Sequence, residues 1–298
     1  MNTAGRIVCA GGAVLDLKIR LQAPSVPGTS NPGSASTSFG GVARNVAEGL
    51  AGLLAGTGLR VDLVSAVGDD VAGAALLAHL RECGIGVGHV QVRPDEATAQ
   101  YVALLEPGGD LTIGAAAMSV LDRIDVAAVD AAWPAGWLFC DGNLSAKVLE
   151  HIVGRARESG TAVAVDAVSA LKVTRLPADL RGLTLLSCNR DEARAWLAHH
   201  RLDPIGDDVE LARRLQAAGA AAVLLTRGAA GLIAVEGDSV HEILAVPATP
   251  VDVTGAGDAL IAGTLAALIT GASLPDAARA GAERAARTVE SEHSVLPA

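Results

Sequence analysis

The sequence predicts an α/β fold, a three-layer α/β/α sandwich with a mostly parallel central sheet and a small inserted β lid. Short runs rich in Val, Leu and Ile recur along the chain and are typical of strands buried on both faces. Longer helical patterns lie between these runs and end at Gly or Pro. This alternation indicates a parallel sheet with helices on both faces.

The position of each element follows from these patterns. The buried strands are expected at residues 7–10, 61–66, 137–140, 162–165, 184–187 and 222–226. The helices are expected at residues 45–54, 73–83, 145–159, 192–200 and 209–218.

The lid is predicted from two segments, 14–38 and 98–115. Residues 14–21 alternate apolar with polar side chains, which indicates a strand with one solvent-exposed face. Residues 24–38 are expected to form a Gly/Pro/Ser-rich connection. The second segment is expected to form a hairpin around the turn at 107–110. The alternative is that these strands extend the central sheet at its edges.

Composition limits the possible partners. A chain of 298 residues can form one large core, so we expect residues 1–298 to be a single domain. Half of the residues are apolar but only 2% are aromatic, so the core must be packed from Ala, Val, Leu and Ile. The net charge of −10 repels phosphate backbones, which argues against a nucleic-acid partner and favours a small molecule.

The sequence gives no indication of secretion or of a membrane. The four cysteines are scattered without a CxxC motif, which favours free thiols in a reducing compartment. The first residues lack a basic region followed by an apolar segment, and no apolar run reaches the roughly 18 residues that span a bilayer. We therefore expect a cytoplasmic protein.

The strongest chemical motif is the run VDVTGAGD at residues 251–258, which precedes an apolar helical stretch. Gly255 and Gly257 let several backbone N–H groups point one way at a helix N-terminus, where the macrodipole also favours an anion. Asp258 would repel a phosphate in this cradle, but it fits there if it takes a proton from a hydroxyl that attacks the phosphate. The alternative is that the carboxylates of this run only stabilise a tight turn and a helix start.

A second motif, FGGVARN at residues 39–45, places a Gly pair before an Asn. The pair lets a substrate lie against the backbone, and Asn45 can offer its amide to sugar hydroxyls. Asp16 follows the first strand, a usual ligand position in open α/β sheets, and could accept two vicinal hydroxyls. The alternatives are a plain Gly turn, an Asn on a solvated face and an Asp that caps a turn.

Two further motifs follow predicted strands. Asn189 and Glu192 can hold a hydrated Mg²⁺ through water, or they can form an N-cap with Glu at position N3. Thr226, Gly228 and Gly231 form a turn that could pass under a nucleotide.

Several signatures are missing from the sequence. It has no GxxxxGK[ST] loop, no GxGxxG opening a helix after the first strand, no GxSxG elbow and no HxH or HExxH spacing. P-loop kinases, Rossmann dehydrogenases, α/β hydrolases and zinc hydrolases are therefore disfavoured.

Together, GGxxxN near residue 40 and DxTGAGD near residue 255 make the chain resemble the ribokinase-like (PfkB-type) carbohydrate kinase family from end to end. The resemblance implies an α/β/α sandwich with a β lid, and a kinase that uses ATP and Mg²⁺ to phosphorylate a nucleoside or sugar hydroxyl. It also implies that Asp258 is the general base and that the amides of Gly255, Ala256, Gly257 and Asp258 form the anion hole.

The remaining ligand contacts are implied by the same resemblance. The sugar would be bound by Asp16, Gly40, Gly41 and Asn45. Mg²⁺ and phosphate would be organised by Asn189 and Glu192, and the adenine nucleotide by Thr226, Gly228, Gly231, Gly255 and Gly257. A monovalent cation such as K⁺ would bind Asp252 and the carbonyl of Thr254, with further ligands from residues 290–294.

Within the family, four segments are most similar to the branch that acts on pseudouridine: residues 30–33, 98–105, 141–145 and 165–172. This likeness implies that the acceptor is bound by Asn31, Gln100, Asn143, Asp166 and Lys172. Asn31 or Gln100 would accept the base N–H that uridine lacks. Ala167 stands where that branch usually has Pro, and Ser187-Cys188 replaces a Lys-Pro approach to Asn189, but neither departure removes a catalytic group.

Other functions are compatible with parts of this pattern. The alternatives are a kinase for another nucleoside, ribose or a hexose, and, in a different class, a non-catalytic nucleoside or sugar sensor on the same fold. Asp258 favours the enzyme, because a sensor needs no base beside the acceptor hydroxyl. We also expect a homodimer through the lid, since bare strand edges tend to find partners.

Overall fold

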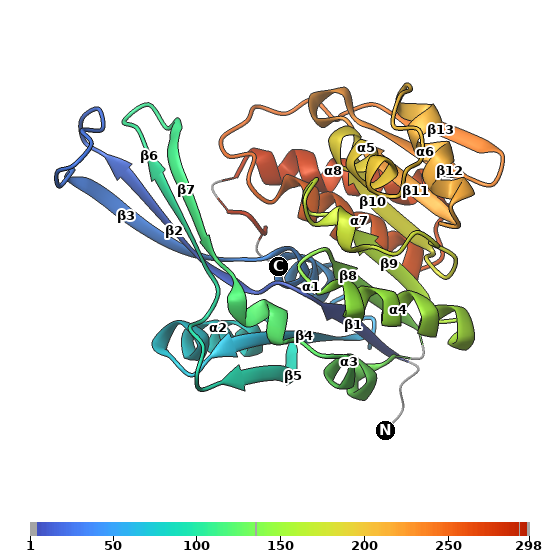
Figure 1. The fold of residues 1–298 in the computed structure, drawn as a ribbon, viewed down its shortest axis with the longest axis horizontal. Coiled ribbons are helices and arrows are strands. Elements are labelled where there is room, and N and C mark those ends of the chain that lie inside the picture. The colour runs from blue at the N-terminus through green and yellow to red at the C-terminus, as the bar shows by residue number, and fades with distance from the viewer. Residues whose placement is uncertain (1–4, 135, 292, 297–298) are drawn as a thin grey trace.

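The computed structural model describes residues 5–134, 136–291 and 293–296. Within them, nine strands form the central sheet in the order β13-β12-β11-β10-β9-β8-β1-β4-β5, and four form a separate sheet in the order β3-β2-β6-β7. The predicted α/β sandwich with a mostly parallel sheet and a β lid is confirmed (Figure 1).

The central sheet is parallel from β5 to β11 along this order, and β12 and β13 complete it as antiparallel strands. Its strands are β1 (Arg6–Ala10), β4 (Arg60–Gly68), β5 (Gly86–Arg93), β8 (Trp137–Asp141), β9 (Ala162–Asp166), β10 (Leu185–Asn189), β11 (Ala222–Thr226), β12 (Leu232–Glu236) and β13 (Ser239–Ile243). Cys9 in β1 is fully buried between its register partners Leu63 and Phe139, as expected for a strand that is covered on both faces.

Helices cover both faces of this sheet. One face packs against α3 (Val126–Ala132), α4 (Ala146–Ser159), α5 (Arg190–His199) and α6 (Asp208–Ala217). The other packs against α1 (Val42–Leu53), α2 (Val71–Glu82), α7 (Ala256–Ile269) and α8 (Leu274–Val289). Helix α7 contacts both α1 and α8, which explains why its sequence is apolar on all sides.

The lid consists of β2 (Val14–Leu21), β3 (Gly33–Gly40), β6 (Gln100–Leu105) and β7 (Leu111–Ala117), and it projects away from the helices (Figure 1). The expectation of a connection at 24–38 is wrong in its second half, because β3 pairs antiparallel with β2 there. The sequence GSASTSFG has little strand propensity and is mostly exposed, so pairing with β2 defines this strand rather than its own pattern.

Besides β3, five helices and strands were not predicted: α3, β5, β12, β13 and α8. Among the described residues, no helix has both the length and the apolar character that crossing a membrane requires.

Candidate active site

The candidate site lies at the edge of the sheet where the parallel strands end. Asp141, Asp166, Asn189 and Thr226 are the last residues of β8, β9, β10 and β11, and parallel strands end at the same edge. A hydrogen bond to Asp141 joins the N-terminus of α1 to this edge, and a hydrogen bond between Asn45 and Asp258 joins α1 to the N-terminus of α7.

The N-terminus of α7 forms the predicted anion cradle. Gly255 is its N-cap with φ of 80°, and a Cβ there would lie 2.2 Å from the carbonyl oxygen of Ser294, so only glycine fits. A Cβ on Gly257 would meet nothing within 4 Å, so the first turn of α7 borders open space. A helix N-terminus with room beside it suits a phosphate.

Asp258 lies in the same first turn and is held by Asn45 of α1. The Nδ2 of Asn45 donates to the Oδ2 of Asp258 at 2.5 Å. Burial raises the pKa of Asp258 to about 6, against the opposing effects of the Asn45 hydrogen bond and of Arg44. A carboxylate with this pKa is a stronger base than an ordinary Asp, yet it is still ionised at neutral pH.

Arg44, which the sequence analysis did not name, fixes the orientation of Asn45. Arg44 is only 2% exposed, and its guanidinium donates to Asn45 Oδ1, to Glu48 and to two backbone carbonyls at the end of β3. Because Arg44 binds the oxygen of the Asn45 amide, the nitrogen points to Asp258. The signal was present in the sequence, since Arg44 lies inside the FGGVARN motif.

Asp16 lies at the base of the lid, against the Gly pair. A Cβ on Gly40 would come within 2.0 Å of Asp16 Oδ2, and a Cβ on Gly41, which has φ of 95°, would lie 2.4 Å from the Gly12 carbonyl oxygen. The backbone therefore requires glycine at Gly41, and a side chain at Gly40 would displace the Asp16 carboxylate. Burial raises the pKa of Asp16, against the opposing effects of Arg44 and Lys18.

Asp141 is a fully buried carboxylate that the sequence analysis did not assign to the site. It accepts hydrogen bonds from the backbone N–H groups of Gly12, Ala43 and Asn143 at 3.0, 2.8 and 2.8 Å. These bonds tie the end of β8 to the turn after β1 and to the first turn of α1. Asp141 therefore holds the backbone next to the Gly pair and at the start of α1, the helix that carries Asn45.

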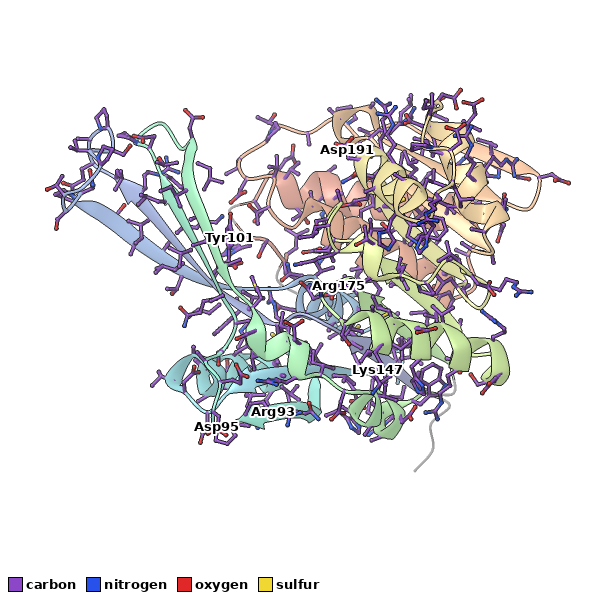
Figure 2. The ribbon with its side chains drawn as sticks, in the orientation of Figure 1. Arg93, Asp95, Tyr101, Lys147, Arg175 and Asp191 are labelled. Atoms are coloured by element: carbon purple, nitrogen blue, oxygen red, sulfur yellow. The ribbon has the colours of Figure 1, made fainter. Side chains whose placement is uncertain are left out.

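Two predicted substrate residues meet directly beside Asp141. The Nζ of Lys172 donates to the Oδ1 of Asn143 at 2.5 Å, and burial lowers the pKa of Lys172. Arg175, in the short helix η3 (Val173–Arg175), donates to the Asn143 carbonyl at 2.9 Å and holds the turn after β8 (Figure 2). The segments 141–145 and 165–172 are thus in contact.

Asn189 and Glu192 form the capping box that the sequence analysis gave as an alternative. Asn189 Oδ1 accepts from the Glu192 N–H at 2.9 Å, and Glu192 Oε2 accepts from the Asn189 N–H at 2.8 Å. Burial raises the pKa of Glu192, and it raises that of Asp166 well above the ordinary value with help from Glu192 and Asp258. Carboxylates that oppose one another's ionisation fit a divalent cation between them.

An apolar pocket of about 700 Å³ lies beside the N-terminus of α7. Thr226, Gly228 and Gly231 line it, together with Ala256 and Gly257 of the cradle. The structure therefore joins the predicted nucleotide turn to the predicted anion hole in one pocket, whose size suits a nucleotide.

Lys18 binds one of the residues that were predicted to hold a monovalent cation. Asp252 Oδ2 accepts from Lys18 Nζ at 2.9 Å, and Asp252 Oδ1 accepts from the Thr254 N–H at 2.8 Å. Burial opposes the ionisation of Asp252, but these hydrogen bonds outweigh it and lower the pKa. The Lys18 ammonium thus supplies positive charge where the resemblance implied K⁺. Further cation ligands were expected from residues 290–294, and residue 292 of these lies outside the described residues.

The two faces of the lid sheet differ in their relation to the site. Tyr101, which is labelled on the lid in Figure 2, is the register partner of Asp16. By this register its side chain shares the face that Asp16 and Lys18 occupy. Gln100 is the register partner of Leu15 and lies on the opposite face. The structure therefore does not bring Gln100 together with Asp16, and it places Tyr101 there instead.

Asn31 is also separated from the other predicted residues. It lies in the loop between β2 and β3, where its amide binds the backbone of Val26 and Thr29. Gly33, which follows this loop, is five strand residues from Ser38, the register partner of Asp16, or about 17 Å at about 3.3 Å per residue. The Asn31 amide is thus used within the lid tip.

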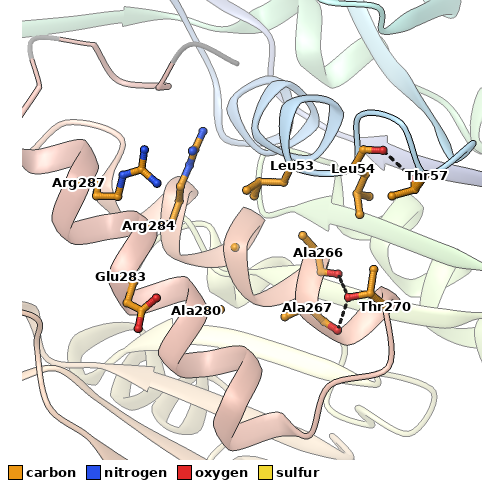
Figure 3. Close-up of a pocket in the computed structure, with 11 residues that line it drawn as sticks. Leu53, Leu54, Thr57, Ala266, Ala267, Thr270, Ala280, Glu283, Arg284 and Arg287 are labelled. Carbon is orange, nitrogen blue, oxygen red and sulfur yellow. Dashed lines mark hydrogen bonds between the residues drawn. The ribbon is translucent and has the colours of Figure 1, made fainter.

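A second pocket of about 350 Å³ lies between α1, α7 and α8 (Figure 3). Ala266, Ala267 and Thr270 line it at the C-terminal end of α7, opposite to the end that holds Asp258. It is therefore separate from the candidate active site.

Comparisons with known proteins agree with this geometry. The pfkB family carbohydrate kinase model matches residues 4–298. The pseudouridine kinase of Escherichia coli (strain K12) is 29% identical over 84% of this chain and 79% of its own length, and the guanosine-inosine kinase of Exiguobacterium acetylicum is 26% identical over 98% and 97%. The solved ribokinase of Thermotoga maritima, 17% identical, has a TM-score of 0.85 over 98% of this chain and 95% of its own.

The family match spans the elements that build the site, from β1 through the lid to α8. The matched range includes both motifs that meet at Asn45 and Asp258, and the Thermotoga maritima ribokinase has a similar fold. The chain belongs to the pfkB family of carbohydrate kinases and is a carbohydrate or nucleoside kinase.

Proposed function

We propose that this kinase transfers the γ-phosphoryl group of ATP to the 5′-hydroxyl of pseudouridine. The hydrogen bond between Asn45 and Asp258 carries the proposal, because it fixes a carboxylate of raised pKa beside a helix N-terminus. Asp16 lies close enough to Asp258 to raise its pKa, and Ala256 and Gly257 of the same turn line the apolar pocket. An acceptor and a nucleotide bound there would both reach α7.

In the proposed step, Asp258 accepts the proton of the 5′-hydroxyl while the hydroxyl oxygen attacks the γ-phosphorus. The bond from that phosphorus to the bridging oxygen breaks, and ADP leaves. The amides of residues 255–258 bind the transferring phosphoryl group, where a preorganised donor is worth most. Mg²⁺, held through water by Asn189 and Glu192, would supply further positive charge there.

The acceptor would lie at the base of the lid. Asp16, Gly40, Gly41 and Asn45 would bind the ribose, and Asn143, Asp166 and Lys172 would lie farther along the strand ends. Asn31 and Gln100 remain sequence predictions for the group that reads the base. Tyr101 is a further candidate, because it shares a lid face with Asp16.

Pseudouridine is supported by the segments around Asn143 and Lys172, which are in contact, and by the Escherichia coli relative of that name. A site that accepts the additional base N–H of pseudouridine would leave a buried acceptor unpaired with uridine. We expect kcat/KM for pseudouridine to exceed that for uridine by at least about tenfold, which needs about 1.4 kcal/mol.

The experiment measures ADP formation with pseudouridine, uridine, adenosine, ribose and fructose, with Asp258→Asn protein as the background control. Equal rates on pseudouridine and uridine, or a preference for ribose or fructose, would reject the acceptor and leave the kinase assignment intact. Guanosine and inosine belong in the panel as a second candidate, because the guanosine-inosine kinase is similar over almost its whole length. A sensor without catalysis would form no ADP with any acceptor.

We further propose that the chain forms a homodimer through the lid. The lid face opposite to Asp16 carries apolar side chains from three strands, namely Leu15, Leu17, Ile19, Val102, Leu104 and Ile113. Ile113 is 60% exposed. A second lid would cover this face and the exposed strand edges.

A further inference from the structure

A cluster of metal-binding side chains lies outside the residues that the proposed reaction uses. Glu48 of α1, His79 of α2 and Cys83 at the end of α2 place Oε2, Nε2 and Sγ within 4.8 Å of one another. The Nε2 of His79 lies 2.9 Å from Glu48 Oε2 and 3.6 Å from Cys83 Sγ. One ring nitrogen therefore faces both a carboxylate and a thiol.

These separations are close to those of a tetrahedral metal site. Bonds of about 2.0–2.2 Å to nitrogen or oxygen and about 2.3 Å to sulfur place neighbouring ligand atoms roughly 3.2–3.8 Å apart, so small side-chain rotations suffice. His79 and Cys83 are four residues apart, which puts both on one face of α2. The Phe39 ring packs on the His79 ring with centroids 4.9 Å apart and holds the imidazole in place.

An ion can reach this cluster. All three side chains are partly exposed, and Glu48 and His79 line a cavity of about 180 Å³. The cavity leaves room for water as a fourth ligand, which is the usual arrangement when three protein side chains hold zinc.

We propose that Glu48, His79 and Cys83 form a binding site for a zinc-class divalent ion. Thiolate and imidazole ligands favour Zn²⁺, whereas Mg²⁺ prefers oxygen ligands and retains its waters. As the metal–sulfur bond forms, the Cys83 thiol releases its proton to solvent, and the metal replaces it on sulfur. No electron is transferred.

The site is coupled to the Asn45–Asp258 pair through Arg44. The same Oε2 of Glu48 that faces His79 also pairs with Arg44, so a bound ion takes a carboxylate away from Arg44. The other carboxylates that interact with Arg44 are Asp258 and Asp16. Arg44 released from Glu48 is drawn toward them, so the ion inhibits the kinase. This inhibition rests on the proposed function, whereas metal binding does not.

Binding is tested with Co²⁺ titrated into the full chain while absorbance is recorded. We expect one equivalent of a thiolate-to-cobalt charge-transfer band, which is lost in Cys83→Ala and weakened by about tenfold or more in affinity in His79→Gln. Cys9→Ala and His151→Gln are matched controls that keep the band. Its absence in the wild type, or its persistence in Cys83→Ala, overturns the site.

Inhibition is tested by titrating Zn²⁺ into the ADP assay at saturating ATP and Mg²⁺. We expect wild-type activity to fall by about tenfold and Cys83→Ala to need at least about tenfold more Zn²⁺ for the same loss. An identical midpoint in both proteins would assign the inhibition to the nucleotide's own metal and overturn the coupling. If no acceptor gives activity, the proposed function fails, while the Co²⁺ band still decides the metal site.

Discussion

Asn45 and Asp258 are 213 residues apart in the chain, yet the amide of Asn45 donates directly to the carboxylate of Asp258 between α1 and α7. Arg44 binds the oxygen of the same amide and so prevents it from flipping. Asp141 binds the backbone at Ala43 and holds the start of α1 in place. The two sequence motifs therefore act together to orient the carboxylate of Asp258, the proposed base.

Replacing Asp258 by Asn should abolish the proposed base without removing its contact, because an Asn carbonyl can still accept from Asn45. We expect kcat to fall by roughly 10² to 10⁴ while ATP binding is retained, as is usual for loss of a positioned general base. Steady-state ADP formation and nucleotide titration measure the two effects. An active variant would remove Asp258 from the mechanism.

Activity should fall as the pH drops through the pKa of Asp258. Burial raises that pKa to about 6, and only the ionised form accepts a proton. We therefore expect kcat/KM to be constant above about pH 7, half-maximal near pH 6, and to approach a tenfold fall per pH unit at lower pH. A profile of kcat/KM from pH 5 to 8 checks this. If kcat/KM instead begins to fall only near pH 4, the pKa of an unperturbed Asp, the site does not raise the pKa of its base.

Ionisation of Asp258, which activity requires, should lower the stability of the fold. The pKa of Asp258 is higher in the folded than in the unfolded chain, so its ionisation destabilises the fold as the pH rises from about 4 to about 6. Asp258→Asn should therefore have a Tm at pH 7.5 equal to or above that of the wild type, and the difference should shrink at low pH. A large loss of Tm at pH 7.5 would contradict this assignment.

The sequence predicted those parts of the molecule that depend on local patterns. The buried parallel strands, the helices with capping residues and the motifs at Asn45 and Asp258 were identified because each has its own signature. Strand β3 was missed because it exists only through pairing with β2, and Asp141 was missed because two of its three backbone partners, Gly12 and Ala43, come from distant segments. The division into one domain and the roles of the site residues remain predictions.

Lid residues were the hardest to assign, for a geometric reason. Neighbouring residues in a strand point to opposite faces, so a displacement of one residue exchanges the site face for the opposite one. Gln100 and Tyr101 differ by one position, and only the register with β2 shows that Tyr101 accompanies Asp16. Asn31 required knowledge of the turn between β2 and β3, which no periodicity supplies.

Asp16→Asn should weaken use of the acceptor far more than use of ATP. A hydroxyl pair that loses its carboxylate costs about 1–3 kcal/mol, so kcat/KM for the acceptor should fall by roughly 10- to 100-fold. Asp110→Asn, in the turn between β6 and β7, is the matched control and should change neither constant. Unchanged acceptor kinetics in Asp16→Asn would place the sugar elsewhere.

Charges on the apolar lid face should dissociate the proposed dimer. Leu17→Lys and Ile113→Lys each place an ammonium group on the face opposite to Asp16, where a second lid would bury it without a partner. Light scattering after gel filtration should show a dimer for the wild type and a monomer for both variants. Ser34→Lys, on the other face beside Arg20, is the control and should stay dimeric; a monomeric wild type would reject the lid interface.

The pair between Lys18 and Asp252 should make the enzyme independent of K⁺. The ammonium lies 2.9 Å from a carboxylate just before the anion cradle, so its removal leaves an uncompensated negative charge near the transferring phosphate. Both side chains are 33% exposed, so the pair should change stability by less than about 1 kcal/mol, and a loss of activity in Lys18→Met would reflect charge rather than unfolding. We expect ADP formation by the wild type to be equal in Na⁺ and K⁺ buffers. ADP formation by Lys18→Met should be low in Na⁺ and partly restored by K⁺. Arg20→Met, on the same strand, is the control and should behave like the wild type. Strong activation of the wild type by K⁺ would instead show that Asp252 and the Thr254 carbonyl bind the cation and that Lys18 yields its place.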